Sequence, residues 1–458
     1  MVDKYQIYHK LPYFLQVIGA SLHGYQLLNW RYGPDTEKFV EEALERDSWT
    51  LNQWEIWQEE RLALILNHAA TQVPYYREQW NFRRRQGDRA SWEVLENWPV
   101  LKKTALREAP CSFLAEGCNP KQKYLEHTSG TTGTPLVLYQ SKDTLHQWYA
   151  LYEARVRRWN GVSRNDRWAI IGGQMVTSFS RSKPPFWVWN ETFHQLYLSS
   201  YHISAENAQS YISAMRRYKV RYILSYPSSL TALADYVLQQ KIPVPPLRAV
   251  ISNAEPLFEF QRSTISSAFH APVINTYGMS ELVCGASECD QGSMHLWPEA
   301  GKVEIMDEDL DELTSGNSTG RIIATGLLNS EMPLIRYETG DRGALRKDTC
   351  ICGRKLPMIN EIEGRIDDVI VTPDGRKIGR LDPIFKTDIP IHEAQIIQED
   401  KNTIRVKFIP DQGYNHDPLL IKRLQEHLGE MDFILEKVES IPRGSNGKFK
   451  AVISNIKP

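Results

Sequence analysis

The stretch that decides the fold runs from Thr128 to Pro135 and reads TSGTTGTP. Its glycines let the backbone turn several N–H groups toward one point, and its hydroxyls add further donors. Such a loop is suited to hold phosphate groups. No Gly-Lys-Ser/Thr follows, so it is not a Walker A loop. A plain polar turn is the alternative, and other segments of the chain decide between the two.

Four further segments place charged side chains beside glycines. YGMSE (277–281) ends an expected buried strand with a carboxylate suited to a cation. YETGD (337–341) ends another with an acid of the type that pairs with ribose hydroxyls. GRIDD (364–368) lies where the composition changes, and PRGSNGK (442–448) places a lysine in a glycine-rich loop. Taken singly, each is more simply a turn, a surface ion pair or a solvated tail.

In this order, the five motifs resemble those of the adenylate-forming superfamily of acyl-CoA synthetases, peptide-synthetase adenylation domains and luciferases. Finer features are similar to the phenylacetate–CoA ligase branch, including its CapK-like relatives in capsular-polysaccharide biosynthesis. They are HAATQVPYYRE at 68–78, SYPSSL at 225–230, SNAEPL at 252–257 and PLIRYETGD at 333–341. The resemblance covers most of the chain and leaves only the N-terminal segment before residue 36 weakly matched.

The hydrophobic pattern independently predicts an α/β fold. Helical spacing over 35–80 is followed by alternating β and α runs, which indicate a parallel sheet covered by helices. The expected strands are 167–171, 222–226, 249–252, 273–277, 302–306, 321–326 and 333–337, and the expected helices include 228–240 and 256–269. Near the C-terminus we expect a hairpin at Asp374–Gly375, strands near 394–399, 403–409 and 433–438, and a helix from Asp417.

The resemblance implies two domains. A large N-terminal AMP-binding domain spans 1–364, with a helical segment at 1–100, helix-covered sheets and a β-rich subdomain. A small mobile α+β domain spans 365–458, with its hinge near Asp367.

Carried over residue by residue, the resemblance implies a catalytic set of Lys448, Glu281 and Arg365. Glu281 binds Mg²⁺, Asp341 binds the ribose with Arg365, and Lys448 contacts the carboxylate and the α-phosphate. The implied nucleotide-binding residues are Thr128, Ser129, Gly130, Thr131, Thr132, Gly133, Ala254, Glu255, Pro256, Asn275, Thr276, Tyr277, Gly278, Asp341 and Arg365. The implied acyl pocket contains Gly172, Gly173, Tyr201, His202 and Tyr226.

Three departures from the family pattern bear on this site. Many members carry a lysine in or just after the phosphate loop, where this chain has Pro135-Leu136; Lys142 or Lys121 is the candidate substitute. Asn275 stands where an acid is common. The glycine after the hinge lies farther along the chain than in CoA ligases, where it borders the pantetheine tunnel. This departure concerns the binding of CoA more than the binding of ATP.

Two cysteine clusters raise a separate question. Cys289 and His295 precede Cys350 and Cys352 in the chain. Three thiols and an imidazole can close the tetrahedral shell of a structural zinc, and Gly353 follows the second cluster as in metal knuckles. Ordinary buried cysteines are the alternative.

The composition argues against nucleic acid as a partner and against a membrane-spanning segment. The 458 residues include 54 basic and 56 acidic side chains, a net charge of −2 without the basic footprint of a nucleic-acid-binding protein. The segment 11–30 is the most membrane-like, but polar residues interrupt it, so we expect a soluble or at most interfacial helix and no transmembrane segment. The N-terminus does not read as a secretory signal. A cytoplasmic location is expected, with attachment to the periphery of the inner membrane left open.

The expected function is ATP- and Mg²⁺-dependent activation of a small carboxylic acid as its acyl-adenylate, followed by acyl transfer. CoA is the favoured acceptor, and an amine or hydroxyl of a sugar or amino acid in surface polysaccharide biosynthesis is the alternative. A catalytically inactive nucleotide-binding relative is the second alternative, against which the intact charged residues argue. The oligomeric state is open, with a homodimer as one option.

Overall fold

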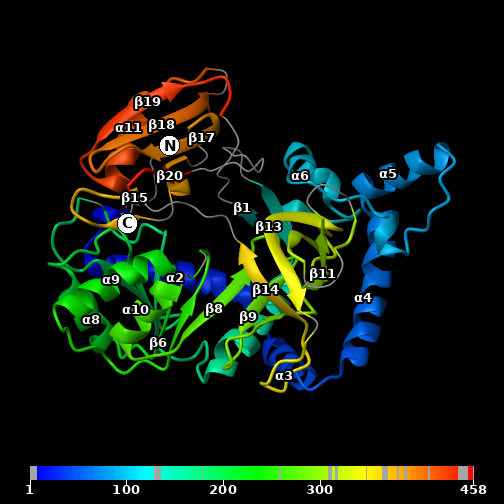
Figure 1. The fold of residues 1–458 in the computed structure, drawn as a ribbon, viewed down its shortest axis with the longest axis horizontal. Coiled ribbons are helices and arrows are strands. Elements are labelled where there is room, and N and C mark those ends of the chain that lie inside the picture. The colour runs from blue at the N-terminus through cyan, green and yellow to red at the C-terminus, as the bar shows by residue number, and fades with distance from the viewer. Residues whose placement is uncertain are drawn as a thin grey trace.

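The computed structural model describes residues 8–127, 136–178, 180–255, 257, 259–307, 312–314, 318–346, 348–363, 370–378, 381–385, 389–410, 413–441 and 452–456. A mixed 12-stranded sheet forms the main body, and a four-stranded sheet near the C-terminus forms a second one (Figure 1). This confirms the predicted α/β class with a small C-terminal domain. The predicted boundary at 364/365 lies outside the described residues and stays a prediction.

The described chain begins with helices, as the pattern over 35–80 predicts. They are α2 (Tyr13–Arg31), α3 (Thr36–Arg46), α4 (Leu51–Gln72), α5 (Pro74–Arg85) and α6 (Lys103–Glu108). A capping box starts α4, because Thr50 and Gln53 each accept a hydrogen bond from the other's backbone N–H. None of the helices in the described part of the chain has the length and apolar character needed to cross a bilayer.

The strands of the large sheet follow in the middle of the chain. They are β3 (Trp168–Gly172), β4 (Trp187–Asn190), β5 (Gln195–Ser199), β6 (Tyr222–Ser225), β7 (Ala249–Ser252), β8 (Val273–Gly278), β9 (Gly285–Glu288), β10 (Met294–Leu296), β11 (Gly301–Met306), β12 (Gly320–Gly326), β13 (Tyr337–Arg346) and β14 (Met358–Glu363). Their spatial order is β11-β12-β13-β14-β10-β9-β8-β7-β6-β3-β5-β4. The neighbours from β8 to β5 are parallel, and the other pairs are antiparallel. A separate antiparallel hairpin joins β1 (Tyr124–His127) to β2 (Val137–Gln140).

Helices cover both faces of the parallel half. One core contains residues of α8 (Ala208–Arg217), α9 (Pro227–Gln239) and α10 (Glu259–Phe269), and another contains residues of α3 and α7 (Lys142–Tyr152). Because side chains alternate along a strand, Ile223 of β6 joins the first core, whereas Tyr222 and Leu224 join the second. Burial on both faces explains why these strands read as continuous apolar runs.

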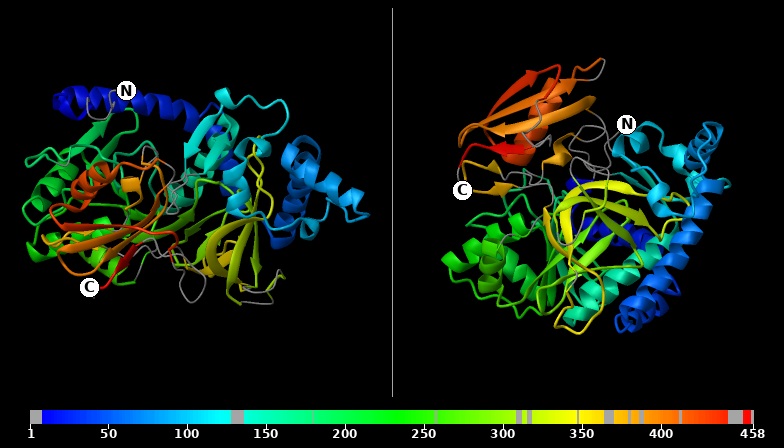
Figure 2. Two further views of the ribbon diagram at one scale, coloured as in Figure 1. Left: turned by 90° about the horizontal axis from the view of Figure 1, so that it is seen from above. Right: turned by 45° about the vertical axis from the view of Figure 1, so that its right-hand side comes forward.

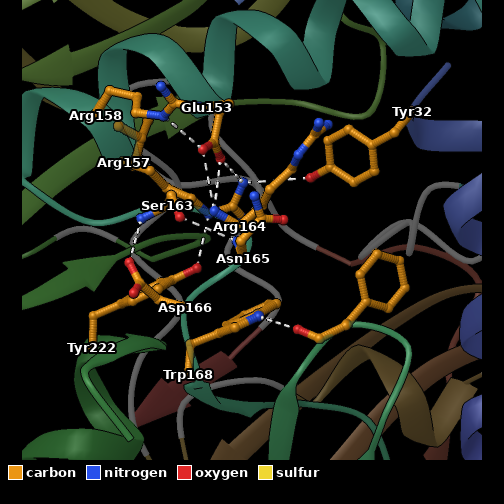
Figure 3. A network of polar contacts seen from close by, with 12 residues as sticks. Tyr32, Glu153, Arg157, Arg158, Ser163, Arg164, Asn165, Asp166, Trp168 and Tyr222 are labelled. Carbon is orange, nitrogen blue, oxygen red and sulfur yellow. Dashed lines mark hydrogen bonds and ion pairs between the residues drawn. The ribbon is translucent and has the colours of Figure 1, made fainter. Parts of the chain in front are cut away.

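A buried polar network fixes the chain after α7 to this sheet (Figure 3). The Glu153 carboxylate is fully buried and accepts hydrogen bonds from the side chains of Arg157 and Arg158 and from the backbone N–H of Arg164. Arg157 Nε also donates to the hydroxyl of Tyr222 at 2.9 Å. A buried carboxylate needs such partners, so this network anchors the segment 153–164 to β6.

The C-terminal body has its own core. Its elements are β15 (Ile370–Val371), β16 (Lys377–Ile378), β17 (Ile391–Gln398), β18 (Thr403–Pro410), α11 (Asp417–Leu428), β19 (Asp432–Lys437) and β20 (Val452–Ser454), with sheet order β19-β18-β17-β20. It lies against the end of the main body that carries α9 (Figure 1). Arg376 Nη1 donates to the Tyr201 carbonyl at 2.9 Å, and the rings of Tyr201 and His427 are 5.3 Å apart.

Most expected elements are confirmed within a few residues, including the hairpin at Asp374–Gly375, where Gly375 N–H donates to the Thr372 carbonyl. The expected strand at 333–337 is wrong, because β13 begins only at Tyr337. Arg336 interrupts the extended chain with φ of 47°, and its buried guanidinium binds Glu304. The mainly apolar segment 333–336 is therefore a buried bend that precedes β13.

Candidate active site

The carboxyl ends of four parallel strands lie side by side. Ile171 of β3 pairs with Ser225 of β6, Ser225 with Ser252 of β7, and Ser252 with Asn275 of β8. The segments that continue from these ends carry most of the predicted acyl and nucleotide residues: 172–173, 226, 253–255 and 276–278. Ligands of open α/β sheets bind at this edge.

Glu281 lies just beyond β8 with its side chain almost fully buried. The hydroxyl of Tyr337, at the start of β13, donates to Glu281 Oε1 at 2.6 Å. Lys103 Nζ lies 3.8 Å from the same oxygen. The two partners hold the carboxylate in one orientation, which suits a ligand of a divalent cation.

Asp341 is also held by a tyrosine of the other motif. The hydroxyl of Tyr277 on β8 donates to Asp341 Oδ2 at 2.8 Å. Burial, and then the neighbouring Cys284 and Asp341, raise the pKa of Tyr277 well above its ordinary value, so this phenol is a neutral donor near pH 7. The first residue of each motif, YGMSE and YETGD, thus binds the last residue of the other.

Lys103 was not predicted as a site residue. Leu101 pairs with Tyr337 in a parallel bridge, and this pairing brings Lys103, two residues further on, close to Glu281. The only signal in the sequence is a pair of adjacent lysines at the start of a short helix. Of the predicted substitutes for the missing loop lysine, Lys142 lies over the ring of Trp30, and Lys121 is exposed.

Residues predicted to line the adenine site lie after β7. Ala254 has φ of 65°, which turns the chain sharply there. The Glu255 carboxylate accepts hydrogen bonds from the N–H and hydroxyl of Ser228, both at 3.0 Å, in the first turn of α9. This side chain therefore caps α9, and a role of position 255 in adenine binding stays a prediction. Pro256 lies outside the described residues.

The β8 residues of the predicted adenine site have structural contacts of their own. Asn275 N–H donates to Glu288 Oε2 at 2.8 Å, and the Thr276 hydroxyl donates to the carbonyl of Ser252 at 2.6 Å. A Cβ at Gly278 would come within 3.3 Å of the Trp148 indole. These contacts fix the strand end that leads to Glu281.

Several predicted residues lie outside the described part of the chain: Thr128, Ser129, Gly130, Thr131, Thr132, Gly133, Arg365, Asp367 and Lys448. The flanks of the phosphate-loop sequence are described. His127 of β1 pairs with Val137 of β2, and Gln140 Nε2 donates to the carbonyl of Ser280 at 2.7 Å. The hairpin that flanks the loop is therefore attached to the residue before Glu281.

The five residues predicted for the acyl pocket lie on neighbouring strand ends. The Tyr201 hydroxyl donates to the Gly173 carbonyl at 2.7 Å, and a Cβ at Gly172 would lie 3.8 Å from the Tyr226 ring. His202 is buried and hydrogen-bonded to a serine hydroxyl at the end of β5. Their role in acid binding stays a prediction.

The four predicted zinc ligands converge. The ligand atoms of Cys289, His295, Cys350 and Cys352 all lie within 4.8 Å of one another. The sulfurs of Cys289 and Cys350 are 3.7 Å apart, and the Cys352 sulfur is 3.4 Å from His295 Nε2. His295 Nδ1 faces the Leu356 carbonyl at 3.4 Å, which leaves Nε2 for the cluster. Burial lowers the pKa of His295, so its imidazole is neutral, as a metal ligand must be.

Two matching Cys-x-x-Gly turns build this cluster. Gly292 N–H donates to the Cys289 carbonyl at 3.0 Å, and Gly353 N–H donates to the Cys350 carbonyl at 3.2 Å. The two glycines have φ of 72° and 88°, which other residues adopt only with strain. The donor set and the paired turns fit a tetrahedral zinc.

A family model described as "AMP-binding enzyme" matches residues 55–330. The chain belongs to the AMP-binding enzyme family. A second model, the CapK C-terminal domain, matches residues 370–455. The motif order thus identified the superfamily correctly, and the protein is an adenylate-forming ligase of the phenylacetate–CoA ligase-like and CapK-like branch.

Relatives of this AMP-binding enzyme cover much of its length. It is 24% identical to protein CapK of Staphylococcus aureus over 462 residues, 98% of this chain and 99% of that protein. It is 26% identical to the phenylacetate-coenzyme A ligase of Pseudomonas putida over 330 residues, 69% of this chain and 71% of that enzyme. The structure of 2-hydroxyisobutyryl-CoA ligase with 2-HIB-AMP and CoA shares its fold (TM-score 0.59, 20% identity, 89% of this chain and 91% of that chain).

Proposed function

We propose that this AMP-binding enzyme uses ATP and Mg²⁺ to convert a carboxylic acid into its acyl-adenylate and then transfers the acyl group to an acceptor. The observation that carries the proposal is the reciprocal pairing of Tyr337 with Glu281 and of Tyr277 with Asp341. It fixes two acids beside a row of strand ends, where a nucleotide and its metal ion need them.

Adenylation joins two anions, because a carboxylate oxygen attacks the α-phosphorus while pyrophosphate leaves. Mg²⁺ bound at Glu281 would neutralise part of the phosphate charge. Lys448 neutralises the carboxylate and the α-phosphate, and Lys103 supplies the cation that the sequence after Gly133 lacks. Losing one such preorganised partner typically costs ~10²–10³ in rate.

The remaining residues orient the substrates. The loop from Thr128 to Gly133 binds the phosphates through its N–H groups and hydroxyls. Asp341 accepts hydrogen bonds from the ribose with Arg365 beside it, and the segments 254–256 and 275–278 enclose the adenine. The acid lies against the strand ends at 172–173, 201–202 and 226.

CoA is the proposed acceptor, since its thiol would attack the acyl carbonyl and release AMP. The similarity to phenylacetate-coenzyme A ligases supports this choice. An amine or hydroxyl of a sugar or amino acid is the alternative. The match to a CapK C-terminal domain at 370–455 supports this alternative. With either acceptor, the small domain would turn about a hinge, here Asp367, between the two half-reactions.

A structural zinc held by Cys289, His295, Cys350 and Cys352 completes the proposal. Four soft ligands close the shell and leave no open position, so the ion takes no part in the chemistry. It would join the turn after β9 to the turn after β13 and so steady the strand beside β8. Because the activity draws on ATP and CoA, we place the enzyme in the cytoplasm.

ATP–pyrophosphate exchange across a panel of carboxylic acids tests adenylation without knowledge of the acceptor. We expect at least one acid to stimulate exchange, and Glu281→Gln to abolish it. ATP consumption that releases phosphate instead of pyrophosphate would contradict the proposal. With the active acid, CoA, amino sugars and amino acids are then compared as acceptors by their acceleration of AMP release.

A further inference from the structure

The exposed face of α2 carries large apolar side chains. Phe14, Ile18, Leu22 and Tyr25 are 63%, 50%, 64% and 59% exposed. Spacings of four, four and three residues place them on one side of the helix, over about 16 Å. We call these four residues the α2 stripe.

The opposite face of α2 is fixed to the edge of the large sheet. Gly24 lies directly against β4, since a Cβ there would come within 2.5 Å of the Asn190 side chain. Ser21 bonds to residues 191 and 192, and Tyr13 bonds to Tyr218. The helix runs along the outer rim of the molecule, and its N-terminal part projects at the left of the view from above (Figure 2). The stripe is therefore held facing outward by packing on its back.

The two long helices α2 and α4 differ in their content of charged side chains. Residues 11–30 contain no Asp, Glu, Lys or Arg. On α4, the equally exposed Leu64 and the exposed Ile56 lie among charged side chains, such as Glu59, Glu60 and Arg61. Helices that face water normally carry charged side chains on the exposed side, as α4 does. The exposed side of α2 lacks them, so it is suited to contact an apolar environment.

The charges before α2 and on its packed side are mainly positive. No acidic residue occurs between Asp3 and Asp35, and Lys10 is exposed four residues before Phe14. On the packed side of the helix, the exposed Arg217 lies 6.0 Å from the ring of Tyr218, the hydrogen-bond partner of Tyr13. The acidic Glu191 lies next to Ser21, and its carboxylate accepts a hydrogen bond from an indole N–H.

We propose that the α2 stripe docks on the surface of an anionic lipid bilayer. An apolar face with aromatic side chains, an exposed lysine before its first residue and no acid along the helix matches a helix that rests in the headgroup region of an anionic bilayer. A second copy fits less well, because it would bring the same cations to the contact without acids on α2 to pair with them. Docking is independent of adenylation and would hold the enzyme beside acyl acceptors or acids carried in the membrane.

Co-sedimentation of the full-length protein with vesicles tests this. We expect binding to phosphatidylcholine vesicles that contain phosphatidylglycerol, and much weaker binding to phosphatidylcholine alone. Leu22→Gln or Phe14→Gln should each weaken binding about tenfold, which is the loss expected for one inserted side chain. The matched control Leu64→Gln removes an equally exposed leucine from α4 and should leave binding unchanged.

Two further measurements keep the proposal falsifiable. Exchange activity without vesicles should be unchanged in all three variants, which shows that they fold. Lys10→Gln should weaken binding about fivefold on anionic vesicles only. Equal binding by wild type and Leu22→Gln, or a wild-type dimer in sedimentation velocity that Leu22→Gln dissociates, would overturn the proposal.

Discussion

The hydroxyl of Tyr337 lies 2.6 Å from the carboxylate of Glu281, although their strands, β13 and β8, are separated by three others in the sheet. In the same way, the hydroxyl of Tyr277 donates a hydrogen bond to the carboxylate of Asp341. Each acid is thus held by the tyrosine of the other motif. The proposed Mg²⁺ ligand and the proposed ribose ligand are therefore positioned as one unit.

Tyr337→Phe should raise the Mg²⁺ concentration needed for half-maximal exchange about tenfold or more. Phenylalanine keeps the packing of this fully buried ring but removes a hydrogen bond to a charged group, which contributes about 1.5–3 kcal/mol. Exchange measured against Mg²⁺ reports this. Tyr76→Phe, which removes another buried tyrosine hydroxyl, should alter thermal stability and leave the Mg²⁺ dependence unchanged. The same Mg²⁺ curve for both variants would remove Tyr337 from this role.

Lys103→Gln should lower exchange ~10²-fold at saturating Mg²⁺ if this lysine replaces the missing loop cation. The adjacent Lys102 is exposed, so Lys102→Gln serves as a control of the same chemistry and should keep wild-type activity. If Lys103 only balanced the charge of Glu281, its loss would instead strengthen Mg²⁺ binding and leave the saturated rate intact.

Lys448→Ala should lower exchange by ~10²–10³ with no change in melting temperature. In the proposed mechanism its ammonium neutralises the two reacting anions during adenylation, a role that needs the charge and not the fold. An unchanged rate of acyl-adenylate formation, measured by rapid quench, would reassign this residue.

The proposed zinc site predicts a loss of thermal stability that precedes any loss of activity. Cys350→Ser should abolish stoichiometric zinc and lower the melting temperature by more than about 5 °C, because metal binding is coupled to folding. Cys111→Ser, at an exposed cysteine outside the cluster, should change neither. Elemental analysis and thermal melts with a chelator check this; zinc-free protein with a chelator-insensitive melt is the contrary result.

Much of this architecture was predictable from local pattern. Continuous apolar runs predicted β6 and β7 because these strands are buried on both faces. The two Cys and His clusters predicted that four candidate metal ligands would converge. Lys103 was missed, because only the Leu101–Tyr337 bridge brings it to Glu281. The two hydrogen bonds by which the tyrosine of each motif binds the acid of the other were also missed. They depend on how three intervening strands set two motifs side by side, which no local spacing encodes.

The most direct test of adenylation follows the oxygen of the substrate. When the active acid carries ¹⁸O in both carboxylate positions, attack on the α-phosphorus places one labelled oxygen in AMP after acyl transfer. Mass spectrometry of the nucleotide products should therefore find AMP with a single ¹⁸O and unlabelled pyrophosphate. Label in inorganic phosphate, with ADP as the nucleotide product, would show attack at the γ-phosphorus and contradict the account.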